Sequence, residues 1–192
     1  MKKSAVILIL FILFSGVKAV EKKTALLVID IQDFYFSGGK WELVNPLPAS
    51  LNAKKLLEHF RSEKMPVVHV RHKTEPGFKI HKNVTPLKEE KVITKTQINS
   101  FKDTDLLDHL KENRIAELVI CGMQSNVCVE AAVRAAADYG FSCILIHDAC
   151  AAKDLEFNGR KILAKDVHTA VLGTLSGSYA KVIDTDTFLE EK

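Results

Sequence analysis

The sequence contains no CxxC pair, no internal repeat and no low-complexity linker, and beyond its first residues it carries no net charge. Of the 27 basic residues, three lie in the first 19 positions and no acidic residue does, so the rest of the chain balances 24 basic against 24 acidic side chains. This balance gives no reason to expect a nucleic-acid or anionic-membrane partner. The 173 residues from position 20 onward suffice for one well-packed domain and are too few for two ordinary ones.

The first nineteen residues have the organisation of a secretory signal peptide. Two lysines precede an apolar run at 5–14, and small residues stand before the expected cleavage point after Ala19. The apolar run is shorter than the roughly 20 residues that cross a bilayer. We therefore predict a signal peptide at 1–19 and a single secreted or periplasmic domain at 20–192, with no membrane association after cleavage. An uncleaved N-terminal anchor is the alternative.

Four cysteines follow, and outside the cytosol an even number of cysteines suggests disulfides. Spacing alone, however, cannot establish the geometry that a disulfide needs. Cys121, Cys143 and Cys150 lie in or at the ends of apolar runs, which favours buried free thiols that behave as small apolar side chains.

Short β-branched runs alternate with helical stretches along the chain, and the run ALLVID at 25–30 shows no apolar–polar alternation, which is typical of a strand covered on both faces. Repeated strand–helix–strand units predict a three-layer α/β/α, doubly wound domain with a mostly parallel sheet of about six strands and Rossmann-like topology. We expect Asp103 to cap the second helix and Gly140 to end the third. The predicted strands are 25–30, 66–71, 91–94, 117–121, 142–147 and 180–183, and the predicted helices are 49–64, 103–113, 126–139 and 162–175.

Three potentially reactive side chains follow predicted strands. Asp30 ends the first strand, Lys95 follows the third, and Cys128 begins the helix after the fourth. Reactive groups in open parallel sheets belong at the carboxyl ends of strands. The carboxylate could take the thiol proton, the ammonium could stabilise negative charge, and the thiolate could attack a carbonyl carbon. From position alone, Cys128 could equally be a buried structural cysteine, and a lysine after an edge strand is usually solvated.

The helix that begins near Cys128 suggests how its thiol is activated. If Ser125 or Asn126 caps this helix, the sulfur lies in the first turn, where partial positive charge favours a thiolate. The unpaired backbone N–H groups there could bind an oxyanion. With Asp30 as the proton acceptor, we expect Asp30→Asn to slow both alkylation of the thiol and turnover.

Three segments together resemble the isochorismatase-like cysteine hydrolases, a superfamily that includes nicotinamidases and N-carbamoylsarcosine amidases. They are ALLVIDIQ with Asp30, KTQINSF with Lys95, and GMQSNVCVEAAVRAAADYGF with Cys128, in the expected order. The similarity runs from about Lys23 to the C-terminus. The segment GMQ resembles the corresponding segment of a branch that contains streptothricin-hydrolase-like enzymes. The resemblance implies that Asp30, Lys95 and Cys128 are the catalytic triad and that the intermediate is a thioester.

The resemblance also implies details of the site. A cis peptide bond falls at Met123–Gln124, and the N–H groups of Gln124 and Cys128 form the oxyanion hole. Superfamily members commonly form oligomers, so we expect a homo-oligomer. The candidates for the substrate pocket, with ordinary core packing as the alternative for the aromatic ones, are Gln32, Phe34, Tyr35, Trp41, His72, Phe101 and Gln124.

The prediction about a bound metal rests on the histidines near the second predicted strand. Nicotinamidases carry a metal site built from an Asp-x-His pair and a further histidine after the second strand. Here that region contains His69, His72 and His81 without such a pair, so we predict no metal and no cofactor. We assign His69 to the strand, and His168 to the surface or an interface. The long irregular segment at 74–86 is expected to cover the site.

These observations predict a metal-independent amidohydrolase that cleaves a C–N bond in a small, non-peptide substrate. Hydrolysis of a cyclic or N-carbamoyl substrate is the nearest alternative. A different class is an exported redox-active thiol protein, against which the missing CxxC partner argues. A catalytically inactive binding module is a third, against which the intact triad argues.

Overall fold

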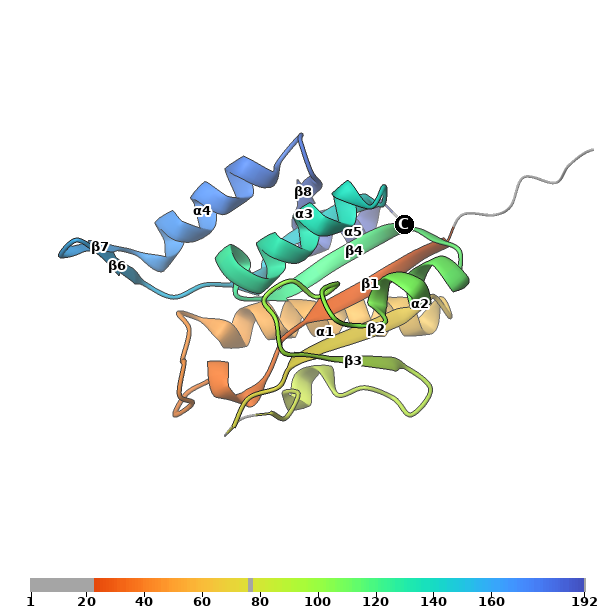
Figure 1. Cartoon of the computed structure of the whole chain (residues 1–192), viewed down its shortest axis with the longest axis horizontal. Coiled ribbons are helices and arrows are strands. Elements are labelled where there is room, and N and C mark those ends of the chain that lie inside the picture. Colours follow the sequence, from red (N-terminus) through yellow and green to blue (C-terminus); the bar gives the residue numbers. More distant parts are fainter. Residues whose placement is uncertain (1–22, 76–77, 192) are drawn as a thin grey trace, which may run out of the picture.

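Six parallel strands form the central sheet, in the order β3-β2-β1-β4-β5-β8 (Figure 1). The computed structural model describes residues 23–75 and 78–191, so the predicted signal peptide lies outside the described residues. The strands of this sheet are β1 (Lys23–Ile29), β2 (Val67–His72), β3 (Lys91–Lys95), β4 (Ile115–Met123), β5 (Ser142–Ala151) and β8 (Lys181–Ile183). The predicted fold class is confirmed.

Helices cover both faces of the sheet and complete the three layers (Figure 1). On one face lie α1 (Pro46–Ser62) and α5 (Thr185–Glu190), and on the other lie α2 (Leu106–Glu112), α3 (Glu130–Asp138) and α4 (Ala164–Leu175). Within the part of the chain that the structure describes, no helix combines the length and apolar character that a bilayer crossing requires.

The packing of β1 explains why its sequence lacks apolar–polar alternation. Leu27 and Ile29 pack in the apolar cluster that contains α2 and α3, whereas Leu26 and Val28 pack in the cluster that contains α1. Each of these side chains is at most 2% exposed. Because helices cover both faces of the parallel sheet here, each of the five buried positions of the strand, 25–29, is apolar.

Several predicted boundaries differ from the structure. The Asp103 cap was wrong, because α2 begins at Leu106 and Asp103 adopts a positive φ of 57° in the preceding turn. Gly140 is confirmed as the stop after α3, with a φ of 88° that glycine tolerates easily. Two elements lie outside the predicted ones: α5 and a two-stranded antiparallel hairpin, β6 (Leu155–Phe157) and β7 (Arg160–Ile162), which projects at one end of the domain (Figure 1).

Gly122 brings β4 against β1 close to the candidate site. It has a φ of 140°, and a Cβ at this position would lie 2.0 Å from the carbonyl oxygen of Ile29. We expect Gly122→Ala to lower the free energy of unfolding by about 2–4 kcal/mol, because both the backbone conformation and the contact are unfavourable. Urea denaturation followed by circular dichroism measures this effect.

The matched control is Gly173→Ala within α4, where a Cβ meets nothing within 4 Å. Alanine in a helix interior should raise stability there by about 0.5–1 kcal/mol. Equal effects of the two substitutions would contradict a close-packing role for Gly122.

Candidate active site

The structure brings Asp30, Lys95 and Cys128 together. Lys95 Nζ lies 2.8 Å from Asp30 Oδ2 and 3.2 Å from Cys128 Sγ. All three residues are buried, with exposed fractions of 0%, 1% and 3% respectively. The sequence placed them at three strand ends, and the sheet now makes them neighbours.

Strand topology explains this convergence. The chain builds β1, β2 and β3 outward in one direction and then returns to place β4 on the other side of β1. Asp30 directly follows β1, and its N–H donates to the carbonyl oxygen of Val70 on β2. Lys95 is the last residue of β3, and Cys128 follows β4. The point where strand order reverses is the usual place for a ligand site in open α/β sheets.

The segment after β4 carries the candidate nucleophile in an unusual turn. The Met123–Gln124 peptide bond is cis, as the resemblance predicted. Cys128 lies in a π-helical turn, Ser125–Val129, that leads into α3. The predicted caps were wrong: Gln124 is the N-cap residue of this turn, and no side chain caps it.

Electrostatics favour a protonated thiol in the resting site. The pKa of Cys128 is raised to about 12, because burial, first, and the Asp30 charge, second, outweigh the lowering effect of Lys95. The pKa of Asp30 is also raised, because burial outweighs the opposing effect of Lys95, and the thiol is among its hydrogen-bond partners. The helix start was expected to favour a thiolate, but burial opposes that effect here, because desolvation of a charged sulfur is the largest contribution at this depth.

His72 is a fourth member of the site. It pairs in register with Lys95 across β2 and β3, and its Nδ1 lies 3.1 Å from Lys95 Nζ. Burial and the Lys95 charge lower the pKa of His72, so the imidazole is neutral and its lone pair faces the ammonium. Lys95 Nζ also donates to the carbonyl oxygen of Gln97 at 3.1 Å.

Gln32 supports His72 from the end of β1. Its Oε1 accepts from the His72 backbone N–H at 2.7 Å, and its Nε2 donates to the carbonyl oxygens of His72 and Phe78, each at 3.1 Å. The Gln32 side chain thus anchors the chain leaving β2. The sequence predicts Gln32 as a pocket residue and gives no sign of this anchoring.

Tyr35, one of the predicted aromatic pocket residues, interacts electrostatically with the reactive groups. Burial raises the pKa of Tyr35, and the charges of Cys128 and Asp30 raise it further, whereas the neighbouring Gln124 side chain lowers it. Phe34 packs edge-on against Tyr35 and Trp41, with ring centroids 4.3 and 5.2 Å away.

Phe101, another predicted pocket residue, is part of the hydrophobic core. It is 6% exposed and packs against Tyr139 and Phe141, with ring centroids 5.4 and 6.4 Å away. It belongs to the same apolar cluster as Cys128. Ordinary packing, the alternative named for the aromatic candidates, accounts for these contacts.

His168 contacts the turn that carries Cys128. It is partly buried, and its Nδ1 lies 3.0 Å from the hydroxyl of Ser125, the fully buried first residue of the turn that carries Cys128. The expected surface position is therefore only partly right, because one side of the imidazole contacts the active-site turn, and the interface alternative stays a prediction. The sequence could have predicted this inward-facing position, because His168 has helical spacing with Ala164, Val171 and Leu175, which face the core.

The three histidines near β2 do not converge on a metal site of the nicotinamidase kind. His69 Nε2 lies 3.0 Å from Glu90 Oε2, and the His81 ring stacks on the Phe36 ring with their centroids 3.7 Å apart. Only His72 reaches the triad, where Lys95 Nζ already lies among the potential ligand atoms. The donor arrangement therefore does not fit the metal site that the resemblance describes.

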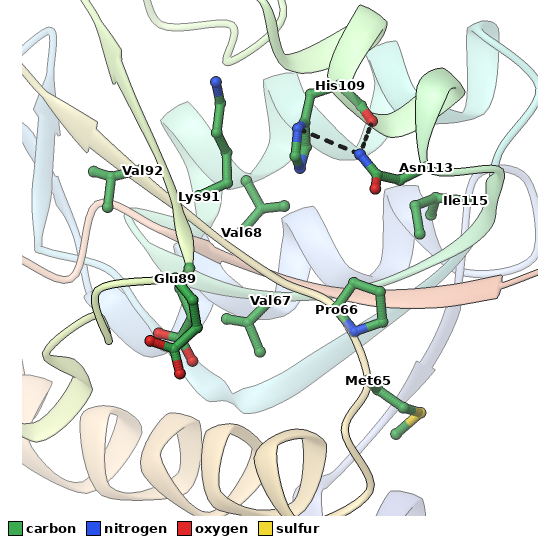
Figure 2. Close-up of a pocket in the computed structure, with 11 residues that line it drawn as sticks. Met65, Pro66, Val67, Val68, Glu89, Lys91, Val92, His109, Asn113 and Ile115 are labelled. Carbon is green, nitrogen blue, oxygen red and sulfur yellow. Dashed lines mark hydrogen bonds between the residues drawn. The ribbon is translucent and has the colours of Figure 1, made fainter.

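A cavity of about 480 Å³ lies elsewhere, beside the amino-terminal ends of the strands (Figure 2). It is lined by the first residues of β2, β3 and β4 and by His109 and Asn113 near the end of α2. Since the triad sits at the opposite ends of these strands, this cavity is not part of the candidate active site.

The isochorismatase domain model matches residues 24–187, so the chain belongs to the isochorismatase family. It is 46% identical to the isochorismatase family protein YddQ of Bacillus subtilis, over 87% of this chain and 99% of the relative. It is 35% identical to streptothricin hydrolase of Streptomyces noursei, over 71% of this chain and 58% of that protein.

Solved structures agree with the sequence matches. An isochorismatase hydrolase structure from Oleispira antarctica superposes with a TM-score of 0.85 at 43% identity, covering 90% of this chain and 98% of the other. The chain is thus an isochorismatase-family hydrolase, with the fold that its strand pattern predicted.

Proposed function

We propose that the protein is a cysteine-dependent hydrolase that cleaves a small non-peptide amide, or a related C–N bond, through a thioester intermediate. The observation that carries this proposal is the buried contact of one ammonium, Lys95 Nζ, with both a carboxylate and a thiol. A thiol, a proton acceptor and a fixed positive charge are the groups that covalent acyl transfer requires.

In the first half of the reaction, the Cys128 thiol transfers its proton to Asp30 as the sulfur attacks the substrate carbonyl carbon. Lys95 stabilises the negative charge on sulfur, and the backbone N–H groups of Gln124 and Cys128 stabilise the oxyanion. The raised pKa of Asp30 suits this step, because the carboxyl group must hold the proton. Asp30 then protonates the departing nitrogen, and the C–N bond breaks.

In the second half, Asp30 takes a proton from water, and the resulting hydroxide attacks the thioester carbonyl carbon. The carbon–sulfur bond breaks, the carboxylic acid leaves, and the thiol of Cys128 regains its proton from Asp30. The depth of the triad supports a small substrate over a protein chain, because each catalytic side chain is at most 3% exposed.

The experiment is a screen of the purified protein with small linear amides, cyclic amides and N-carbamoyl compounds, with matched esters as comparison. Nitrogen-product release from linear amides, lost in Lys95→Met by about 100-fold or more, is the expected result. Preference for cyclic or N-carbamoyl compounds would select the alternative substrate class. Cleavage of esters alone would contradict the C–N assignment.

We also propose that the mature protein is exported to the periplasm or medium and begins at Val20, from the signal-peptide pattern of the first 19 residues. N-terminal sequencing of protein isolated from the producing cell measures this. A protein that still begins at Met1 would contradict cleavage, and fractionation of that form with membranes would support the anchor instead.

A further inference from the structure

Lys95 occupies the centre of a group of metal-ligating atoms. In the described residues 23–75 and 78–191, one group of three potential ligands has its donor atoms within 4.8 Å of one another, and its members are Asp30, His72 and Cys128. Lys95 Nζ lies 2.8 Å from the carboxylate, 3.1 Å from the imidazole Nδ1 and 3.2 Å from the sulfur. The ammonium therefore stands where a cation held by all three would stand.

We propose that Asp30, His72 and Cys128 form a binding site for a thiophilic divalent cation, with Zn²⁺ as the best match, and that the Lys95 ammonium keeps this site closed. Lys95 would then have a second role beside the catalytic one, which is to exclude metal from the nucleophile. The inference goes beyond the proposed function and does not depend on which bond the enzyme hydrolyses.

The donor set matches zinc chemistry. Zinc binds thiolate sulfur, imidazole nitrogen and carboxylate oxygen at about 2.0–2.3 Å, and three protein ligands leave a fourth position for water. Tetrahedral geometry at those bond lengths places ligand atoms roughly 3.3–3.8 Å apart. The three donor atoms here already lie within 4.8 Å of one another, so modest side-chain rotation closes the gap.

His72 is prepared for this role by its present contact. Its Nδ1 lies 3.1 Å from the Lys95 ammonium, which can only donate, so this nitrogen accepts the hydrogen bond and its lone pair already faces the position of the cation. Gln32 fixes the His72 backbone on both sides of the residue. Only the thiol must give up a proton, which leaves to solvent as the zinc–sulfur bond forms.

The ammonium opposes the metal in two ways. It is a like charge at the same position, and the pair is poorly screened because the Lys95 side chain is fully buried. It is also held by a fourth partner outside the ligand group, the carbonyl oxygen of Gln97. Zinc must displace the ammonium from all of these contacts, and metal bound in this way would block the sulfur from attack.

The test compares Zn²⁺ affinity of the wild type and Lys95→Met, measured by competition with a chromophoric chelator and without substrate. Lys95→Met should bind one Zn²⁺ per chain, at least about 100-fold more tightly than the wild type. Lys73→Met is the matched control, because Lys73 is exposed and touches Lys95 only through a backbone hydrogen bond. Its zinc affinity should equal that of the wild type.

Cobalt identifies the ligands. Co²⁺ bound to Lys95→Met should show a thiolate-to-cobalt charge-transfer band, which disappears when Cys128→Ala is added. Zinc affinities of Lys95→Met and the wild type within threefold of each other, or a cobalt complex without the thiolate band, would overturn the proposal.

A second measurement avoids the Lys95 variant in case it does not fold. Excess Zn²⁺ should protect Cys128 from iodoacetamide in the wild type, and His72→Phe should abolish the protection. Equal protection in both proteins, or none in the wild type, would refute the three-ligand site. Because none of these readouts uses turnover, an inactive protein that binds zinc would reject only the proposed function.

Discussion

Cys128→Ala is expected to reduce kcat on any amide substrate by about 10⁴-fold or more, because it removes the atom that bonds to the acyl group. The side chain is small and the change is from one buried small residue to another, so the fold should persist. Steady-state kinetics measure the loss, and circular dichroism verifies the fold. Cys143→Ala is the matched control, since Cys143 lies buried on β5 and its sulfur contacts the Phe141 carbonyl instead of the triad.

The same prediction has a direct chemical signature. Rapidly quenched wild-type enzyme with a slow substrate should carry the acyl mass on the peptide that contains Cys128. If Cys128→Ala turns over as fast as the wild type, an attacking water held by other groups becomes the better explanation. If the acyl adduct never appears and Cys128 is instead reversibly oxidised by peroxide, the redox alternative gains support.

Asp30→Asn should have opposite effects on alkylation and on turnover. The Asp30 charge raises the pKa of Cys128 and Lys95 lowers it, so removing the carboxylate charge leaves only the lowering contribution of the pair. The thiol pKa then falls, the thiolate fraction at pH 8 rises about tenfold for each pKa unit, and iodoacetamide modifies Cys128 faster. Turnover should fall by roughly 10²–10⁴-fold, because no group remains to protonate the departing nitrogen.

Peptide-level mass spectrometry of Cys128 across pH 6–10 measures the first effect, and steady-state kinetics measure the second. Asp108→Asn, an exposed change on α2, is the control and should alter neither. Slower alkylation in Asp30→Asn would restore the simpler view from the sequence, in which Asp30 acts only as the proton acceptor of the thiol. Unchanged turnover would remove Asp30 from the mechanism.

Most of the site could be predicted because its parts are local in sequence. Asp30, Lys95 and Cys128 each lie at or after the carboxyl end of a strand, and the rule that strand ends converge in a parallel sheet needs no further detail. The remaining members could not be found in this way. His72 contacts Lys95 only because β2 and β3 pair in one particular register, and His168 reaches Ser125 only because α4 packs over the turn after β4.

The sequence by itself determined the layered α/β fold, the strand ends that carry the triad, the stop at Gly140 and the cis peptide implied by the family motif. The fold, the strand ends and the stop follow from apolar periodicity and from residue types that act through their own backbone, whereas the cis peptide is what the resemblance to the family implies. Only the tertiary structure decided the charge state of the site. The pKa of Cys128 depends on how deeply the sulfur is buried and on which charges surround it, and those are properties of packing between segments distant in the chain. For the same reason, only the fold showed that Lys95 lies among three metal-ligating atoms.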